Sequence, residues 1–234
     1  MDRLFTKVID FKKDVFRNIV SLRETQDLYD DLSEGDFELT AIAVEAEARV
    51  KENIPSGFIE RGFHYSQAIG YPFDTQPFMA SRYGDGTFGV WYASVDSLET
   101  SIWETAYHMI QDELNNYGLR ETVIRERAVY LVRCEGILLN LVGREKDYPQ
   151  LVSDEYSYTQ NVGRRLAKEG HPGLQAPSAR CKGVNVAIFN PEILPNQRIY
   201  MYLTYHFDPA ARKVEVERQP GEFLMTVSFS SPEP

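Results

Sequence analysis

Three side chains with complementary chemistry occur within one stretch of the chain, Ser81 to His108. Arg82 carries a planar and permanently charged guanidinium group, which binds phosphate oxygens through a fork of N–H donors. Tyr92 ends a short apolar run typical of a strand and offers both an aromatic face and a hydroxyl group. Glu104 follows two turns into the next predicted helix, where a carboxylate can offset developing positive charge. Together these residues predict a pocket for an anionic small molecule.

The position of Glu104 on its helix leaves two interpretations open. The apolar arc of that helix holds Leu98, Ile102 and Ala106, and Glu104 lies off this arc, as a solvated surface residue would. The helix is, however, entered directly from a strand and has aromatic neighbours, which favours a flank that faces a cleft. His108, one turn further on, is equally ambiguous and is given no catalytic role.

Two further residues are candidates for the same pocket. Arg61 lies in an irregular stretch rich in aromatic residues, Pro and Gly, and we predict that it binds a phosphate group. Ser178 lies in a loop that follows a strand end. No G-x-S-x-G motif surrounds it, so the sequence does not indicate a hydrolase nucleophile.

Bulk composition excludes several classes of protein. The 234 residues are 43% hydrophobic and 26% charged, which fits a folded globular domain. The net charge of −10 disfavours a nucleic-acid partner. Two cysteines without C-x-x-C spacing and four scattered histidines do not form the pattern of a metal site, and we predict none. No signal peptide and no run of 18 apolar residues is found, so we expect a cytoplasmic protein without membrane contact.

The first 55 residues differ in pattern from the rest. Apolar residues between Phe5 and Ile19, and again between Leu39 and Val50, recur at spacings of three and four, which predicts two amphipathic helices. We therefore divide the chain into an N-terminal helical arm, residues 1–55, and a catalytic domain, residues 56–234. The arm either covers the core of the main domain or serves as an interaction surface.

The catalytic domain reads as an α+β fold with a central, mostly antiparallel sheet and flanking helices. A capping box of Asp96 and Glu99 predicts a helix over residues 97–117, and Gly170 predicts the end of a second helix over residues 158–168. Strands are predicted over residues 87–94, 128–134, 137–142, 184–189, 198–207, 212–217 and 223–229.

Several blocks between Arg61 and Leu194 resemble the RES-domain family, whose members include bacterial NAD-consuming toxins of RES–Xre toxin–antitoxin systems. The blocks are SRYGDGTFGVWYAS, SIWETAYH, GLQAPSAR and NVAIFNP. The resemblance implies a site laid out as in ADP-ribosyltransferase toxins, built from an arginine, a tyrosine, a glutamate and a serine. These fall on Arg82, Tyr92, Glu104 and Ser178, and Arg61 matches an earlier arginine of the family.

The chemistry implied by the resemblance is cleavage of the nicotinamide–ribose bond of NAD+, which serves as substrate rather than as a cofactor. Glu104 would accept a hydrogen bond from the ribose and offset the charge of an oxocarbenium-like state, and Arg82 would bind the pyrophosphate. Tyr92 would stack on nicotinamide or bond the ribose, and Ser178 would orient the attacking group. The absence of a G-x-G-x-x-G motif that opens a helix argues against a Rossmann dehydrogenase.

Three functions remain open on the sequence. The first is an NAD+ glycohydrolase or phosphorylase that acts as a toxin and is neutralised by a cognate antitoxin, a partner that the resemblance implies. The second is a mono-ADP-ribosyltransferase with the same residues and a protein acceptor. The third is a non-catalytic interaction protein that uses the N-terminal arm.

Overall fold

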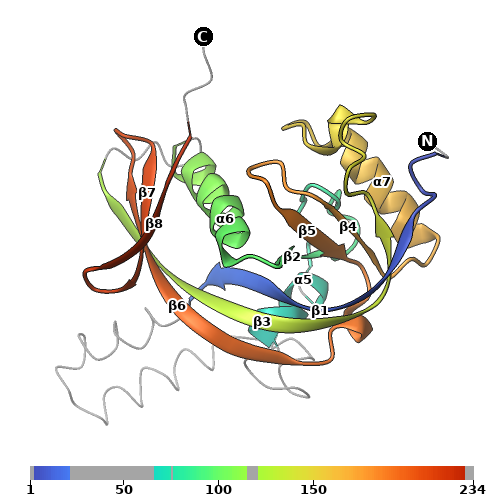
Figure 1. Ribbon diagram of the computed structural model, residues 1–234, viewed down its shortest axis with the longest axis horizontal. Helices are drawn as coiled ribbons and strands as arrows, with labels where there is room; N and C mark the ends of the chain where they lie inside the picture. Colours follow the sequence, from blue (N-terminus) through green and yellow to red (C-terminus); the bar gives the residue numbers. More distant parts are fainter. Residues whose placement is uncertain (1–2, 22–65, 75, 115–120, 230–234) are drawn as a thin grey trace.

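The computed structural model describes residues 3–21, 66–74, 76–114 and 121–229. These residues form a large sheet with three helices and several short helical turns (Figure 1). The strands are β1 (Val8–Val20), β2 (Trp91–Val95), β3 (Val123–Asn140), β4 (Gly173–Pro177), β5 (Val184–Ile188), β6 (Gln197–Asp208), β7 (Lys213–Gln219) and β8 (Glu222–Ser228). The helices are α5 (Tyr71–Asp74), α6 (Leu98–Asp112) and α7 (Ser157–Lys168), and the short turns are η1 (Ser66–Gly70), η3 (Pro149–Leu151) and η4 (Pro191–Ile193). In the described part of the chain, no helix has the length and apolar character that a membrane span requires.

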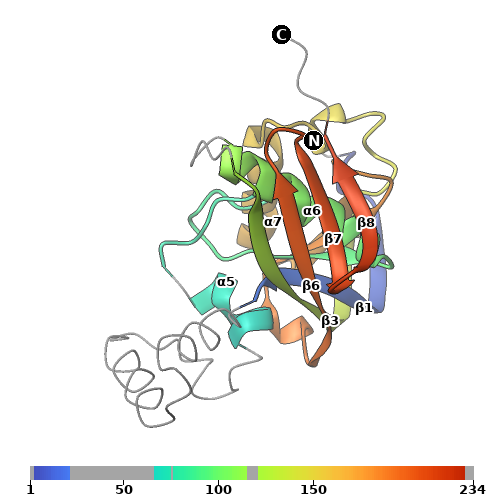
Figure 2. The same cartoon turned by 90° about the vertical axis from the view of Figure 1, so that its left-hand side faces the viewer.

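Strand pairing closes part of the sheet on itself. The strand order is β1-β2-β5-β4-β3-β6-β7-β8, and β1 also pairs with β3, so the first five strands of that order form a ring. All of these pairings are antiparallel except that of β3 with β4. The remaining strands extend from β3 as neighbouring antiparallel strands (Figure 2). The predicted mostly antiparallel sheet with flanking helices is confirmed, whereas the layout of an ADP-ribosyltransferase stays a prediction.

The predicted first helix of the N-terminal arm is wrong, because residues 8–20 form β1. Phe11 and Val15 are buried in the core, and their spacing of four places them on one face of a helix or of a strand, since four is an even number. Pairing with β3 from Val8↔Leu139 to Val20↔Arg127 decides between the two in favour of the strand. Residues 8–20 therefore belong to the main sheet, and the predicted second helix over 39–50 lies outside the described residues.

Alternation along β2 and β5 separates a core face from a polar face. Trp91, Ala93 and Val95 of β2 pack in one buried cluster with Val186 and Ile188 of β5. Because successive side chains of a strand point to opposite faces, the residues between them, Tyr92, Ser94 and Asn185, lie on the other face. This other face is the one on which the polar contacts described below are made.

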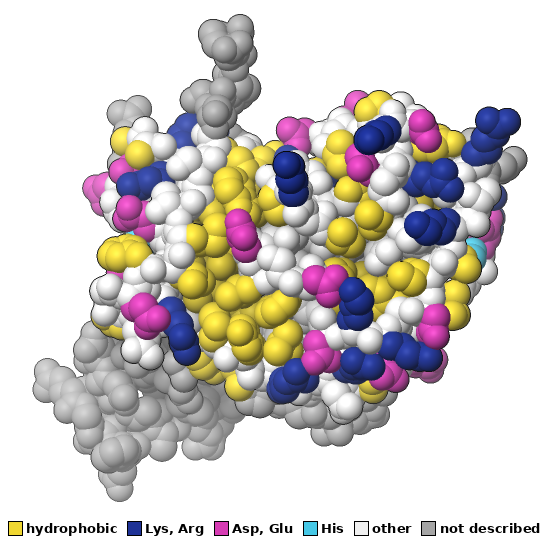
Figure 3. Space-filling view, in the orientation of Figure 1, with side chains coloured by type: hydrophobic (Ala, Val, Ile, Leu, Met, Phe, Trp, Pro, Cys, Tyr) yellow, Lys and Arg dark blue, Asp and Glu magenta, His cyan; other side chains and the backbone are white. Residues whose placement is uncertain are grey.

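Helix α6 packs against the strands at the far end of the sheet. Ile102, Ala106 and Ile110 are fully buried in a cluster with residues of β6, β7 and β8. Figure 1 shows α6 between that end of the sheet and strands β4 and β5, and α7 beyond them. In the same view, hydrophobic side chains gather in a band between β8 and the strands β4 and β5 (Figure 3).

The predicted end of α7 is found in the structure, whereas the predicted cap of α6 is not. Helix α6 is capped by Ser97, whose side chain accepts a hydrogen bond from the Thr100 N–H, and not by Asp96 as predicted. Asp96 instead adopts a φ of 61° and pairs with Lys13 of β1. The predicted end of α7 at Gly170 is confirmed, because Gly170 has a φ of 78° and its N–H bonds to the carbonyl of Ala167.

One strand replaces two predicted ones. The segment predicted over 128–134 and residues 137–140 of the segment predicted over 137–142 are parts of β3, which runs through Gly136 without a break and ends at Asn140. A side chain at Gly136 would lie 3.2 Å from Ile193 of η4, so glycine here permits close packing and does not mark a turn.

Candidate active site

A cavity of about 670 Å³ opens between β1, β2, α6 and the segments around residues 71–82 and 154–156. Its size falls in the range of small-molecule sites. Arg82, Tyr92 and Glu104 all line it, so the structure brings together three of the predicted site residues. Arg61 lies outside the described residues.

Glu104 lies in the cavity wall, and its two carboxylate oxygens differ in their hydrogen bonds. The residue is only 8% exposed, so the interpretation of Glu104 as a solvated surface residue is wrong. Oε1 accepts hydrogen bonds from Ser178 Oγ and Asn185 Nδ2, both at 2.6 Å. Within the described residues, no hydrogen bond to Oε2 is found. The carboxylate is therefore fixed through one oxygen while the other remains available to a ligand.

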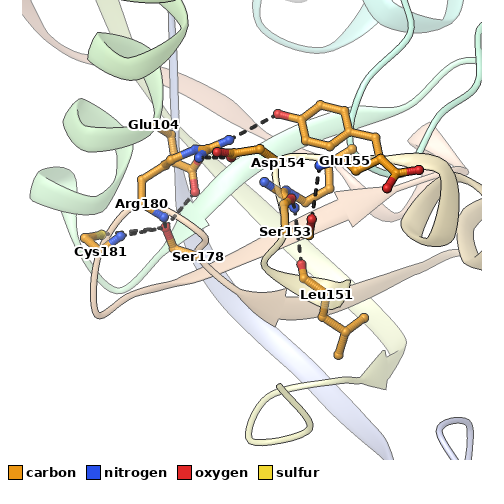
Figure 4. Close-up of polar contacts among 10 residues, drawn as sticks. Glu104, Leu151, Ser153, Asp154, Glu155, Ser178, Arg180 and Cys181 are labelled. Carbon is orange, nitrogen blue, oxygen red and sulfur yellow. Dashed lines mark hydrogen bonds and ion pairs between the residues drawn. The ribbon is translucent and has the colours of Figure 1, made fainter. Parts of the chain in front are cut away.

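Ser178 reaches the cavity only through Glu104. Its hydroxyl donates to Glu104 and accepts from the backbone N–H groups of Arg180 and Cys181 at 3.0 and 3.3 Å (Figure 4). The residue is 7% exposed and does not line the cavity. This arrangement orients the carboxylate, whereas direct orientation of an attacking group by Ser178 stays a prediction.

Asn185 is a site residue that the sequence analysis missed. Its side chain is fully buried, donates to Glu104 and accepts from Ser94 Oγ at 2.8 Å. A buried amide requires partners for its donors and acceptor, and here the partners come from β2 and α6. An asparagine inside the apolar strand sequence VNVAI is the signal that could have found it, because such a strand otherwise buries apolar side chains only.

Arg82 is committed in part to the protein itself. It is 6% exposed, and its Nη1 donates to the carbonyl oxygens of Ser153 at 2.6 Å and Leu151 at 3.3 Å. The guanidinium lies 4.6 Å from the ring centroid of Tyr156. Nη2 is buried and has no partner among the described residues. Arg82 thus positions the loop 151–156 and leaves only Nη2 without a partner among the described residues, rather than the whole fork expected from the sequence.

Tyr92 and His108, two titratable residues that line the cavity with Glu104, are neutral at physiological pH. Burial, followed by the charge of Glu104, raises the pKa of Tyr92 well above its ordinary value. Desolvation lowers the pKa of His108, which also lines the cavity, against the opposing influence of Glu104. Tyr92 is therefore a hydrogen-bonding phenol, and His108 is an uncharged imidazole at neutral pH.

Arg180 joins the loop 154–156 to α6. Its side chain is 7% exposed, bonds to the carboxylate of Asp154 and donates to the Tyr156 hydroxyl at 3.3 Å. On its other side the guanidinium lies 3.3 Å from the ring centroid of Tyr107 on α6. Because Tyr107, Asp154 and Tyr156 all line the cavity, this bridge fixes two of its walls relative to each other.

The described part of the site offers no grouping suited to a metal ion. Among the described residues, no cluster of three or more His, Cys, Asp or Glu side chains could hold one. The chemistry available from the residues themselves is that of a fixed carboxylate, a neutral phenol and guanidinium groups, which suits an anionic ligand that develops positive charge elsewhere.

Comparison with known proteins places the chain in a family. No curated protein matches it in sequence. A chain of the M. tuberculosis MbcT–MbcA toxin–antitoxin complex is similar in structure, with a TM-score of 0.44 and 12% identity over 87% of this chain and 88% of that chain. The model of the RES domain matches residues 58–208, which is more than half of the sequence and includes Arg82, Tyr92, Glu104 and Ser178. The chain therefore belongs to the RES domain family.

Proposed function

We propose that this protein is a toxin that cleaves the nicotinamide–ribose bond of NAD+, with water or inorganic phosphate as the acceptor. The main observation that supports the proposal is that the Glu104 carboxylate is anchored in the cavity through one of its two oxygens. A carboxylate anchored through Oε1 by Ser178 and Asn185 presents Oε2 in a fixed direction, without reorganisation during the reaction.

The electrostatics of the cavity suit bond cleavage by departure of nicotinamide. Nicotinamide leaves as a neutral base, and positive charge develops on the ribose. Glu104 Oε2 would accept a hydrogen bond from a ribose hydroxyl and stabilise this charge. Preorganised groups of this kind contribute about 3–4 kcal/mol, or about 10²- to 10³-fold in rate.

Tyr92 and Arg82 would hold the substrate on either side of the carboxylate. The high pKa of Tyr92, caused first by burial, keeps the phenol protonated, so it can donate a hydrogen bond or stack on the nicotinamide ring. Arg82 would contribute Nη2 to the pyrophosphate, because its Nη1 already bonds to Leu151 and Ser153.

The cellular setting belongs to the same proposal. Members of RES–Xre systems are held by an antitoxin, and we propose such a partner here, with the cytoplasm as the place of action. Where the acceptor is a protein side chain rather than water or phosphate, the same residues would give a mono-ADP-ribosyltransferase.

Product analysis with purified protein tests the proposal. The protein is incubated with NAD+, with and without phosphate, and the products are identified by mass. We expect nicotinamide together with ADP-ribose or its 1″-phosphate. Unchanged NAD+ that is consumed only when other proteins are added would favour the transferase.

Two variants of α6 assign the activity to the site. Glu104→Gln keeps an acceptor for Ser178 and Asn185 but removes the charge, so we expect a loss of about 10²- to 10³-fold in nicotinamide release with little change in thermal stability. Glu99→Gln removes an exposed carboxylate from the first turn of the same helix and serves as the matched control. Equal activity of the Glu104→Gln variant and the wild type would refute the proposal.

A further inference from the structure

One wall of the cavity comes from β1, which lies outside the residues matched by the RES domain. β1 pairs with β2 only at Val15↔Val95 and Phe16↔Ser94. Beyond this point the Arg17 side chain bridges the two strands, and its Nη1 donates to the carbonyl oxygen of Tyr92 at 2.6 Å. A cation from the N-terminal strand is thereby attached to the backbone of a predicted site residue.

Arg17 has no anionic partner in the described part of the chain. Its Nε is buried and makes no hydrogen bond there, and its guanidinium carbon lies 5.5 Å from the ring centroid of Trp91. A carbonyl and an aromatic face stabilise a cation but do not neutralise it. Charges that are largely withdrawn from solvent are generally paired, so the half-buried Arg17 is an exception among the described residues.

A second guanidinium reinforces the positive charge at this end of the cavity. Arg127 of β3 donates Nε to Asn18 Oδ1 and Nη2 to the Asn18 carbonyl, both at 3.0 Å. Burial, and then the charge of Arg127, lowers the pKa of Arg17 to about 10, so Arg17 still carries its charge at neutral pH. An anion that entered the cavity would relieve both the desolvation and the repulsion.

The acidic groups that line the cavity do not fill this role. The acidic residues of its lining are Glu104, Asp112 and Asp154. Asp154 is paired with Arg180, Oε1 of Glu104 is bonded to Ser178 and Asn185, and Asp112 lies at the end of α6. No salt bridge joins Arg17 to a carboxylate of the described chain. Within the described residues, therefore, no anion pairs with Arg17, and a bound ligand could bring one.

We propose that Arg17 is a further substrate-binding residue, which binds a phosphoryl group beside Tyr92 and is supplied by a strand outside the RES domain match. This inference rests on the proposed function for the identity of the ligand. The phosphoryl group belongs to the pyrophosphate of the dinucleotide or to inorganic phosphate as the acceptor, and the two sources share the same chemistry.

Calorimetric titration of the full chain tests the inference through binding, a readout separate from nicotinamide release from NAD+. The ligands are ADP-ribose, inorganic phosphate and nicotinamide riboside, which has no phosphoryl group. We expect Arg17→Gln to weaken binding of ADP-ribose or of phosphate by about 10- to 100-fold, in line with loss of a charge-assisted hydrogen bond, and to leave nicotinamide riboside unchanged. The ligand that is weakened identifies the source of the phosphoryl group.

Two further variants control for folding and for charge. Arg17→Lys keeps the charge without the planar fork, and we expect it to lose less affinity than Arg17→Gln does. If Arg17→Gln does not fold, Arg17→Lys takes its place in the test. Arg133→Gln removes a partly exposed arginine of β3 that pairs with Asp14 and Glu135 and does not line the cavity, and it should bind all three ligands as the wild type does.

The outcomes separate this inference from the proposed function. Wild-type affinity of both Arg17 variants for ADP-ribose and phosphate, or an equal loss for nicotinamide riboside, would overturn the role of Arg17. So would a wild-type protein that binds neither phosphoryl ligand. Absence of nicotinamide release from NAD+ would instead refute the proposed function, and the binding results would still decide the role of Arg17.

Discussion

Replacement of Asn185 by aspartate places a second carboxylate against Glu104. With the 2.6 Å separation of the two side chains retained, two unit charges repel by about 6 kcal/mol at an effective dielectric constant of about 20. One pKa unit corresponds to about 1.4 kcal/mol, so this repulsion raises the pKa of the pair by up to about four units. Two carboxylates this close cannot both be ionised at neutral pH, so the pair would share one proton.

A shared proton removes much of the charge that the proposed mechanism requires. We expect the Asn185→Asp variant to release nicotinamide from NAD+ about 100-fold more slowly than the wild type at pH 7. Its rate should rise towards pH 9, as the pair loses its remaining proton. The assay is the pH profile of nicotinamide release between pH 6 and 9.5, and circular dichroism verifies the fold at each pH.

Asn190→Asp is the control, because it adds the same charge at the cap of η4, where the side chain accepts from the Glu192 N–H. This variant should keep the wild-type profile. An Asn185→Asp variant that is fully active at pH 7, or folded but equally slow at every pH, would refute the reasoning that Asn185 acts by keeping Glu104 charged.

Three other predictions test the supports of the site. Gly163→Ala should lower the free energy of unfolding, measured in urea, by about 2 kcal/mol or more, because the new Cβ would lie 1.8 Å from the Tyr83 carbonyl oxygen. The control is Gly143→Ala, whose Cβ would meet no atom within 4 Å but whose φ of 82° should cost only about 1 kcal/mol. Equal losses in the two variants would contradict this explanation. Desolvation lowers the pKa of His108, so the unfolded chain takes up the proton first and wild-type stability should fall as pH drops below about 6.5. The side chain is exposed, so solvent screening keeps this contribution small. Denaturation of His108→Gln at pH 7.5 and 5.5 should show a shallower dependence, and a parallel one would exclude this histidine as the cause. Ser178→Ala removes one of two donors to Glu104 and should reduce kcat about 10-fold with little change in KM for NAD+; an unchanged kcat would show that Asn185 alone suffices.

Features that depend on neighbours in sequence were predictable. The turn, strand and helix between Arg82 and Glu104 are local and were predicted from the residues, whereas the prediction that the three side chains share a site also needed the resemblance to the RES-domain family. Helix α7 and its end at Gly170 follow from an apolar periodicity and a single glycine, and the C-terminal strands follow from alternation. In these segments local preference and tertiary packing favour the same structure.

Features that depend on distant partners were not predictable. The apolar spacing of β1 fits a helix as well as a strand, and only pairing with β3 more than a hundred residues later resolves it. Glu104 looks solvated on a helical wheel, because the wheel shows only residues of the helix. Its hydrogen-bond partner Asn185 is 81 positions away in sequence. In the sequence, Arg17 does not differ from the other charged residues of its strand. Only the fold places β2 beside it and its side chain in the cavity wall.

The ring of strands has a consequence for the chain as it is synthesised. A ribosome that has reached residue 170 has made Arg82, Tyr92 and Glu104 but neither of the donors that fix the carboxylate, which follow with the loop after β4 and with β5. Pairing over such sequence distances is slow compared with helix formation. Nascent and prematurely terminated chains would thus carry Arg82, Tyr92 and Glu104 without an assembled site. The candidate site would be complete only once β5, the last strand of the ring, has left the ribosome.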